Sequence, residues 1–108
     1  MQTRSLCYVS DLVRGLRAVM EQPGMAGELF NLGNPDERTI LDLATIIIER
    51  CGSRSPIQFE PARQDDPERR CPNIDKVRTA LGWQPTVSLE DGLHATIEYF
   101  SAYEALPV

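Results

Sequence analysis

Apolar residues recur three and four positions apart in long segments of the chain, the spacing that places side chains on one face of an α-helix. The first such segment predicts a helix that begins at a cap formed by Ser10 or Asp11 and ends near Gln22. The second predicts a helix between a cap at Thr39 and Gly52, because threonine suits a helix start and glycine a helix end.

Shorter segments complete the pattern. Ser88 is expected to cap a final helix, and residues 74–81 are expected to form a short one. Compact or alternating apolar runs predict strands over residues 6–9, 28–32 and 57–60. Short connections between these elements indicate a single α/β domain without internal repeats.

The composition fits one globular domain, since the chain has 108 residues of which 42% are hydrophobic. A net charge of −5 without a basic run argues against a nucleic-acid partner or an anionic-membrane partner. The longest apolar run, residues 44–48, is interrupted by Thr45 and is far shorter than the ~20 residues of a membrane span. No signal peptide is expected in residues 1–20, which lack an apolar core.

Cysteine and histidine usage excludes several kinds of site. Cys7, Cys51 and Cys71 have no Cys-x-x-Cys spacing, so neither a disulfide framework nor a metal site is indicated. Free thiols favour a reduced, cytoplasmic setting. His94 is the only histidine and is expected to be solvated on a helix surface, which leaves no Ser-His-Asp triad.

Arg69 and Arg70 lie in a loop bounded by Pro67 and Pro72. Prolines prevent this segment from continuing as a helix or a central strand. Arginines fixed in such a loop suit bidentate binding of phosphate or carboxylate. On local chemistry alone, a solvated loop is the simpler alternative, with the arginines paired to neighbouring acids. These acids are Asp65, Asp66 and Glu68.

Three motifs in a fixed order make the pattern more specific. They are Gln-Thr-Arg-Ser-Leu-Cys-Tyr-Val-Ser-Asp-Leu-Val at residues 2–13, Phe-Asn-Leu-Gly-Asn-Pro at residues 30–35, and Asp-Asp-Pro-Glu-Arg-Arg-Cys-Pro-Asn-Ile at residues 65–74. Leu-Gly-Trp-Gln-Pro follows at residues 81–85. In this order they resemble the C-terminal portion of nucleotide-sugar enzymes of the extended short-chain dehydrogenase/reductase family, the NAD-dependent epimerases/dehydratases. Within that family the chain is most similar to the UDP-glucuronate decarboxylases (UDP-xylose synthases).

The resemblance implies an α/β fold with two parts. Residues 1–34 would supply the last strand and a helix of a Rossmann sheet, with the strand at residues 28–32. Residues 35–108 would form the small C-terminal substrate-binding domain. The chain would thus be the distal third of a longer enzyme.

Two motifs of that family do not occur in this chain. Gly24 and Gly27 are not in a Gly-x-Gly-x-x-Gly frame, and Lys76, the only lysine, does not follow a tyrosine at the spacing Tyr-x-x-x-Lys. The resemblance implies NAD as the cofactor of the complete enzyme. No NAD is expected to bind to this chain alone, and the chain is expected to be inactive by itself.

The resemblance also assigns site residues. It implies that Arg4 contacts the nucleotide pyrophosphate, with Gln2 as a weaker companion; the alternative is a disordered N-terminal arginine. It gives Arg70 a catalytic and substrate-binding role near the sugar carboxylate, where a fixed cation stabilises a developing enolate. The sequence departs from the family at Asn73, where Asp is usual, and at Leu6, where an aromatic residue is usual.

The implied reaction converts UDP-glucuronate to UDP-xylose and carbon dioxide. The alternatives are a fragment of a nucleotide-sugar 4-epimerase or 4,6-dehydratase, a non-catalytic sugar-nucleotide-binding or docking module, and a structural domain without a ligand. A UDP-sugar is the expected ligand, bound weakly in isolation. Exposure of the strand at residues 28–32 and of the first helix predicts a homo-oligomer, with an interface centred on Leu16, Val19, Leu29 and Phe30.

Overall fold

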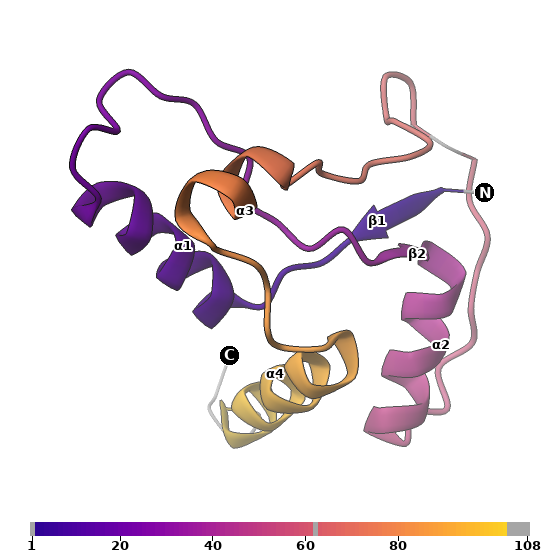
Figure 1. The fold of residues 1–108 in the computed structure, drawn as a ribbon. Helices are drawn as coiled ribbons and strands as arrows, with labels where there is room; N and C mark the ends of the chain where they lie inside the picture. The colour runs from indigo at the N-terminus through magenta and orange to yellow at the C-terminus, as the bar shows by residue number, and fades with distance from the viewer. Residues whose placement is uncertain (1, 62, 104–108) are drawn as a thin grey trace.

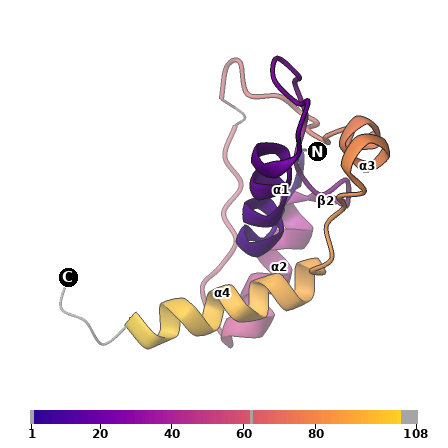
Figure 2. The same cartoon turned by 60° about the vertical axis from the view of Figure 1, so that its left-hand side comes forward.

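The computed structural model describes residues 2–61 and 63–103. Its elements are β1 (Thr3–Ser5), α1 (Val9–Glu21), β2 (Glu37–Thr39), α2 (Ile40–Cys51), α3 (Asp75–Leu81) and α4 (Leu89–Tyr103) (Figure 1). The two strands pair antiparallel and place Arg4 opposite Arg38. The helices lie below and to the left of this small sheet in Figure 1, and α4 projects beyond the other elements in the second view (Figure 2). The predicted α/β class is confirmed.

The helix ends follow the local sequence in two of the three long helices. Thr39 accepts a hydrogen bond from the Asp42 amide at 3.0 Å and begins α2, which ends at Gly52 with φ of 61°. Ser88 accepts a hydrogen bond from the Asp91 amide at 3.1 Å and begins α4. The predicted start of α1 was wrong. Tyr8 occupies the cap position without a side-chain hydrogen bond, and Asp11 is buried in the first turn.

The core lies where α1, α3 and the segment before α4 meet. Ile74, Val77 and Trp83 are each no more than 2% exposed. Half-buried apolar residues pack around them: Cys7, Phe30, Leu32 and Leu81. Gly15 lets α1 approach Trp83 closely, because a Cβ atom at this position would lie 3.0 Å from the indole ring. The core therefore joins residues from the first and the last third of the chain.

The predicted strands at residues 6–9, 28–32 and 57–60 are not strands in this structure, whereas β1 and β2 lie in polar segments that the pattern did not indicate. An extended segment is a strand only when a neighbour completes its hydrogen-bond ladder, and β1 and β2 are the paired strands of the described residues. Leu29 is 81% exposed and Phe59 76% exposed. The division into residues 1–34 and 35–108 stays a prediction.

Candidate functional site

The arginine loop of residues 66–70 lies along one edge of β1, and β2 occupies the other edge. The Thr3 amide donates a hydrogen bond to the Glu68 carbonyl at 2.8 Å, and the Ser5 hydroxyl donates to the Arg70 carbonyl at 3.4 Å. A left-handed residue, Asp65 with φ of 68°, precedes the loop. The loop thus lies beside the two-stranded sheet without forming a strand of it.

Arg4 holds the first half of this loop. Its guanidinium donates to the Asp66 carboxylate at 2.7 Å, to the Pro67 carbonyl at 3.0 Å and to its own neighbour, the Thr3 carbonyl, at 2.6 Å. Gln2 donates to the other Asp66 oxygen at 3.0 Å. These contacts place both predicted site residues of the N-terminal segment against the loop. The alternative of a disordered N-terminal Arg4 is not what the structure shows.

Glu37, at the start of β2, holds the second half of the arginine loop. Its carboxylate accepts two hydrogen bonds from Arg69, at 2.7 and 2.8 Å, and one from the Thr3 hydroxyl. The bonds from Arg69, followed by the bond from Thr3, lower the pKa of Glu37 from 4.5 to about 2. The alternative of a solvated loop pairs Arg69 with its acidic neighbours, whereas the structure pairs it with Glu37.

Arg70 differs from Arg4 and Arg69 in its contacts. Its side chain is exposed, and its guanidinium makes no hydrogen bond or ion pair with the residues that the structure describes. Asn73 follows, and its side chain accepts a hydrogen bond from the Asp75 amide at 2.9 Å at the start of α3. The structure thus brings Gln2, Arg4 and the Arg70 backbone together and leaves one cationic side chain available.

A pocket of about 770 Å³ adjoins the loop on the side of α2. Gln2, Asp66 and Glu68 give it a polar rim, and the remaining lining comes from α2 and residues 57–60. This wall is mainly apolar, formed by Ile40, Leu41, Ala44, Ile57 and Phe59 with Gln58 and Glu60. A concave apolar site next to fixed polar groups is the usual form of a small-molecule pocket.

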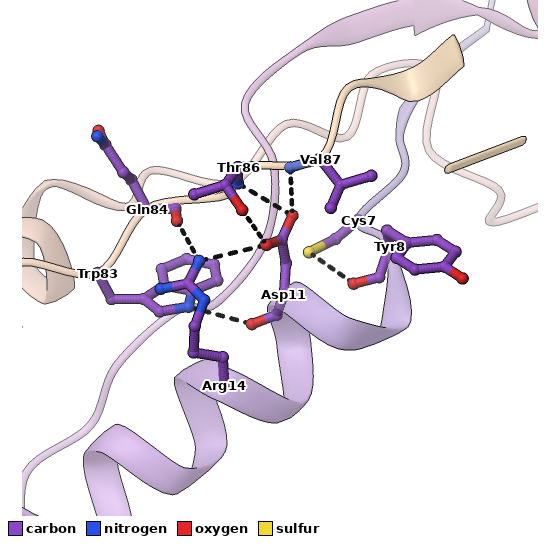
Figure 3. A network of polar contacts seen from close by, with 8 residues as sticks. All are labelled: Cys7, Tyr8, Asp11, Arg14, Trp83, Gln84, Thr86 and Val87. Atoms are coloured by element: carbon purple, nitrogen blue, oxygen red, sulfur yellow. Dashed lines mark hydrogen bonds and ion pairs between the residues drawn. The ribbon is translucent and has the colours of Figure 1, made fainter. Parts of the chain in front are cut away.

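A second polar network surrounds the buried side chain of Asp11 in the first turn of α1 (Figure 3). The Asp11 carboxylate, 1% exposed, accepts hydrogen bonds from the Thr86 amide, the Thr86 hydroxyl and the Val87 amide at 3.0 to 3.1 Å. Arg14 also donates to it, at 3.2 Å, and Trp83 donates to the Asp11 carbonyl at 3.1 Å. Burial alone would raise the pKa of Asp11, but these hydrogen bonds outweigh burial and lower it.

The described residues do not contain a site of the kind that the dinucleotide implied by the resemblance would need. A pyrophosphate is held at a helix N-terminus after a glycine-rich turn. Tyr8, Thr39 and Ser88 stand at or just before the starts of the long helices α1, α2 and α4, and none of these starts follows a glycine-rich turn. No group of three or more metal-ligating side chains occurs among these residues either. His94 is exposed and pairs with Glu98 at 3.1 Å.

A comparison with family models decides the membership of the chain. The model described as GDP-mannose 4,6 dehydratase matches residues 1–96. The chain belongs to this family. The resemblance to NAD-dependent nucleotide-sugar epimerases and dehydratases is therefore confirmed.

Relatives within the family include UDP-glucuronic acid decarboxylases. The chain is 53% identical to UDP-glucuronic acid decarboxylase 1 of Danio rerio over 100 residues, which cover 93% of this chain and 23% of that protein. It is 46% identical to UDP-glucuronic acid decarboxylase 1 of Arabidopsis thaliana over 99 residues, covering 92% of this chain and 22% of that protein. The chain thus spans about a quarter of the length of these relatives.

Solved structures of family members show the same arrangement. An epimerase from Methanothermobacter thermautotrophicus superposes with a TM-score of 0.92 at 34% identity, over 97% of this chain and 32% of the epimerase. UDP-glucuronic acid 4-epimerase from Bacillus cereus, in complex with UDP-glucuronic acid and NAD, gives a TM-score of 0.86 at 32% identity over 94% of this chain and 32% of that enzyme. The fold of this chain is that of part of a Rossmann-type epimerase or dehydratase.

Proposed function

We propose that the chain is the UDP-sugar-binding part of an NAD-dependent UDP-glucuronate decarboxylase. The observation that carries this proposal is Arg70, an exposed cation without a partner in the described chain, on a loop whose backbone is held at several points. The identity of 53% to a decarboxylase, compared with 32–34% to the epimerases above, supports this enzyme over an epimerase.

The chemistry of an arginine fork suits the substrate. UDP-glucuronate carries a diphosphate and a carboxylate, and a planar guanidinium binds either group through two parallel hydrogen bonds. Three of the five N–H donors of Arg4 are used by the chain itself, which leaves two for a ligand. Gln2 and Arg4 would bind the nucleotide side, and Arg70 the carboxylate side.

Arg70 would also contribute to catalysis. When a β-keto carboxylate loses carbon dioxide, negative charge develops on the enolate that remains. A cation fixed beforehand stabilises that charge without reorganisation during the reaction. The oxidation that creates the keto group requires a cofactor site that the described residues do not provide, so we expect no turnover by this chain alone.

A chimera tests the proposal directly. The matching segment of the Danio rerio decarboxylase is replaced by this chain, and release of carbon dioxide from UDP-glucuronate is followed. We expect activity in the chimera, and a fall in turnover on the order of 100-fold or more with Arg70→Ala. Arg54→Ala, in the exposed segment after α2, serves as the control. Normal kinetics with Arg70→Ala would refute the assigned role.

A 4-epimerase or 4,6-dehydratase origin is the nearest competitor, because the solved structures above include a 4-epimerase. The same segment exchange into the Bacillus cereus 4-epimerase separates the two. If the chain carries decarboxylase determinants, we expect this second chimera to lose epimerisation. An active epimerase chimera together with an inactive decarboxylase chimera would favour the competitor.

We also propose that the isolated chain associates with itself. The apolar stripe of α1 is open to solvent: Val9 is 62% exposed, Leu16 50% and Met20 82%. Contiguous exposed apolar surface of this kind rarely persists on monomers. The predicted role of residues 28–32 as an exposed strand was wrong, because this segment is unpaired and Phe30 packs on the core. Analytical ultracentrifugation at micromolar concentration tests the proposal, and a well-folded monomer would refute it.

Location is a separate matter. Among the described residues, no helix is long and apolar enough to cross a bilayer. The cytoplasmic setting expected from the cysteines stays a prediction.

A further inference from the structure

Glu37 connects three segments that are far apart in the sequence. It belongs to β2, its carboxylate accepts a hydrogen bond from the Thr3 hydroxyl of β1, and it accepts two from Arg69 of the arginine loop. Its side chain is 21% exposed, against 74% for Arg69. The partly buried carboxylate is therefore the fixed member of the pair, and the loop arginine is the member that is held.

The pair of Glu37 and Arg69 fixes the residue directly before Arg70. The Arg70 backbone has one contact to the sheet, from the Ser5 hydroxyl at 3.4 Å, which is long for a hydrogen bond between these atoms. The preceding residue, by contrast, is fixed by two parallel bonds of 2.7 and 2.8 Å. A two-point hold on Arg69 restricts the backbone from which the Arg70 side chain departs.

We propose that Glu37 is a positioning residue for Arg70: by holding Arg69 against β1 and β2, it fixes the segment that presents the Arg70 guanidinium to an anion. The choice of anion, a UDP-sugar, rests on the function proposed above. The positioning role of Glu37 does not rest on that function, because it concerns contacts within this chain.

The charge of Glu37 and its positioning role predict opposite changes in anion affinity when Glu37 is substituted. A carboxylate beside an anion site repels the ligand, so its removal should raise anion affinity if charge alone mattered. If Glu37 acts by position, its removal should lower affinity, because Arg69 is released and Arg70 loses its fixed origin. Glu37→Gln keeps the size of the side chain and removes the charge and the second acceptor oxygen.

The experiment titrates the 108-residue chain with UDP-glucuronate, and separately with inorganic pyrophosphate, while NMR follows the arginine Nε–H signals and the backbone amides. We expect Glu37→Gln to weaken binding of both probes by about three- to fivefold, the effect of losing one well-formed ion pair on ligand geometry. Arg69→Lys, which keeps the charge but not the fork, should give a smaller loss. Glu49→Gln, on the exposed side of α2, is the matched control and should change binding little.

A second measurement does not depend on a ligand. In Glu37→Gln, 15N relaxation should show increased motion for the amides of residues 68–70, with α1 and α4 unchanged. Unchanged relaxation, or binding that is equal or tighter, would overturn the proposal for Glu37. If the Arg70→Ala variant binds UDP-glucuronate as tightly as the original chain does, the proposed function is refuted instead. The relaxation data would still decide the role of Glu37.

Discussion

Two carboxylates organise this small chain, and their surroundings differ. Asp11 is 1% exposed and accepts two backbone amide hydrogen bonds from Thr86 and Val87. Glu37 lies at the surface of the sheet and is held chiefly by an exposed arginine. In the buried network, loss of the carboxylate leaves amides without a partner. In the surface network, water can replace whatever is lost.

The comparison separates stability from geometry. A buried polar group that loses its partner costs more than the net gain of an ordinary hydrogen bond, whereas exposed ion pairs contribute little to folding. We therefore expect the Asp11 network to determine whether the chain folds, and the arginine loop to determine what the folded chain can bind.

The largest expected effect is that of Asp11→Asn. The asparagine carbonyl can still accept from the Thr86 and Val87 amides, which share one carboxylate oxygen, but its NH2 group then faces the Arg14 guanidinium. With the negative charge also lost, the free energy of unfolding should fall by about 2 kcal/mol. Urea denaturation followed by circular dichroism measures it. Asp75→Asn, which removes a carboxylate that is 79% exposed, is the control and should change stability by less than about 0.5 kcal/mol. Equal effects of the two changes would contradict the comparison.

Gly15→Ala tests how tightly α1 packs against the buried Trp83 ring. The added Cβ would lie 3.0 Å from the Trp83 ring and 3.2 Å from a Leu32 methyl group. Overpacking of about 1–3 kcal/mol should exceed the helix-propensity gain of about 1 kcal/mol, leaving a net loss of roughly 1 kcal/mol. Ser10→Ala, at an exposed position of α1, provides the control in the same denaturation experiment. A more stable Gly15→Ala would show that the ring can move aside.

Arg4→Ala tests a side chain whose exposure, 21%, lies between that of Asp11 and that of Arg69. It should destabilise the chain by about 1 kcal/mol through the lost contacts to Asp66 and Pro67. The Arg17 side chain is 72% exposed in its pair with Glu21. Arg17→Ala should therefore lower the free energy of unfolding by less than about 0.5 kcal/mol. Thermal or urea unfolding of both variants checks the order, and a larger loss at Arg17 would reverse it.

The smallest effect is the pH dependence of the surface pair. The folded pKa of Glu37 is about 2, below its ordinary value of 4.5, so its contribution is fully present above about pH 4.5 and is lost as the pH falls towards 2. The difference in stability between the original chain and Glu37→Gln should therefore be constant from pH 5 to 8 and shrink below pH 4.5. Urea midpoints over this range test it, and a difference that grows in acid would contradict the assignment.

Features that depend on neighbouring residues were predictable from the sequence. The cap at Thr39, the glycine at position 52 and the cap at Ser88 were correct, because short-range hydrogen bonds and backbone preferences determine them. The family motifs also indicated Gln2, Arg4 and Arg70 as a group. The structure brings their backbones together, and their roles stay predictions.

Features that depend on distant partners were not predictable in this way. Asp11 satisfies the rule for a helix cap, but its partners are 75 and 76 residues away and draw it into the core. Glu37 and Arg69 are 32 residues apart, and neither belongs to a recognisable motif pair. Residues 28–32 and 57–60 have the composition of strands, but pairing, not composition, makes a strand.

The contact between Asp11 and Thr86 also has a consequence for how the chain is made. The helix α1 emerges from the ribosome long before residue 86, and until then the Asp11 carboxylate has Arg14, on the same helix, and water as its partners. Closing a loop of this length is slow compared with forming a helix, so native contacts of the N-terminal helix should form late. Synthesis that stops before residue 86 should therefore leave the Asp11 carboxylate without the Thr86 and Val87 amides that it binds in the folded chain.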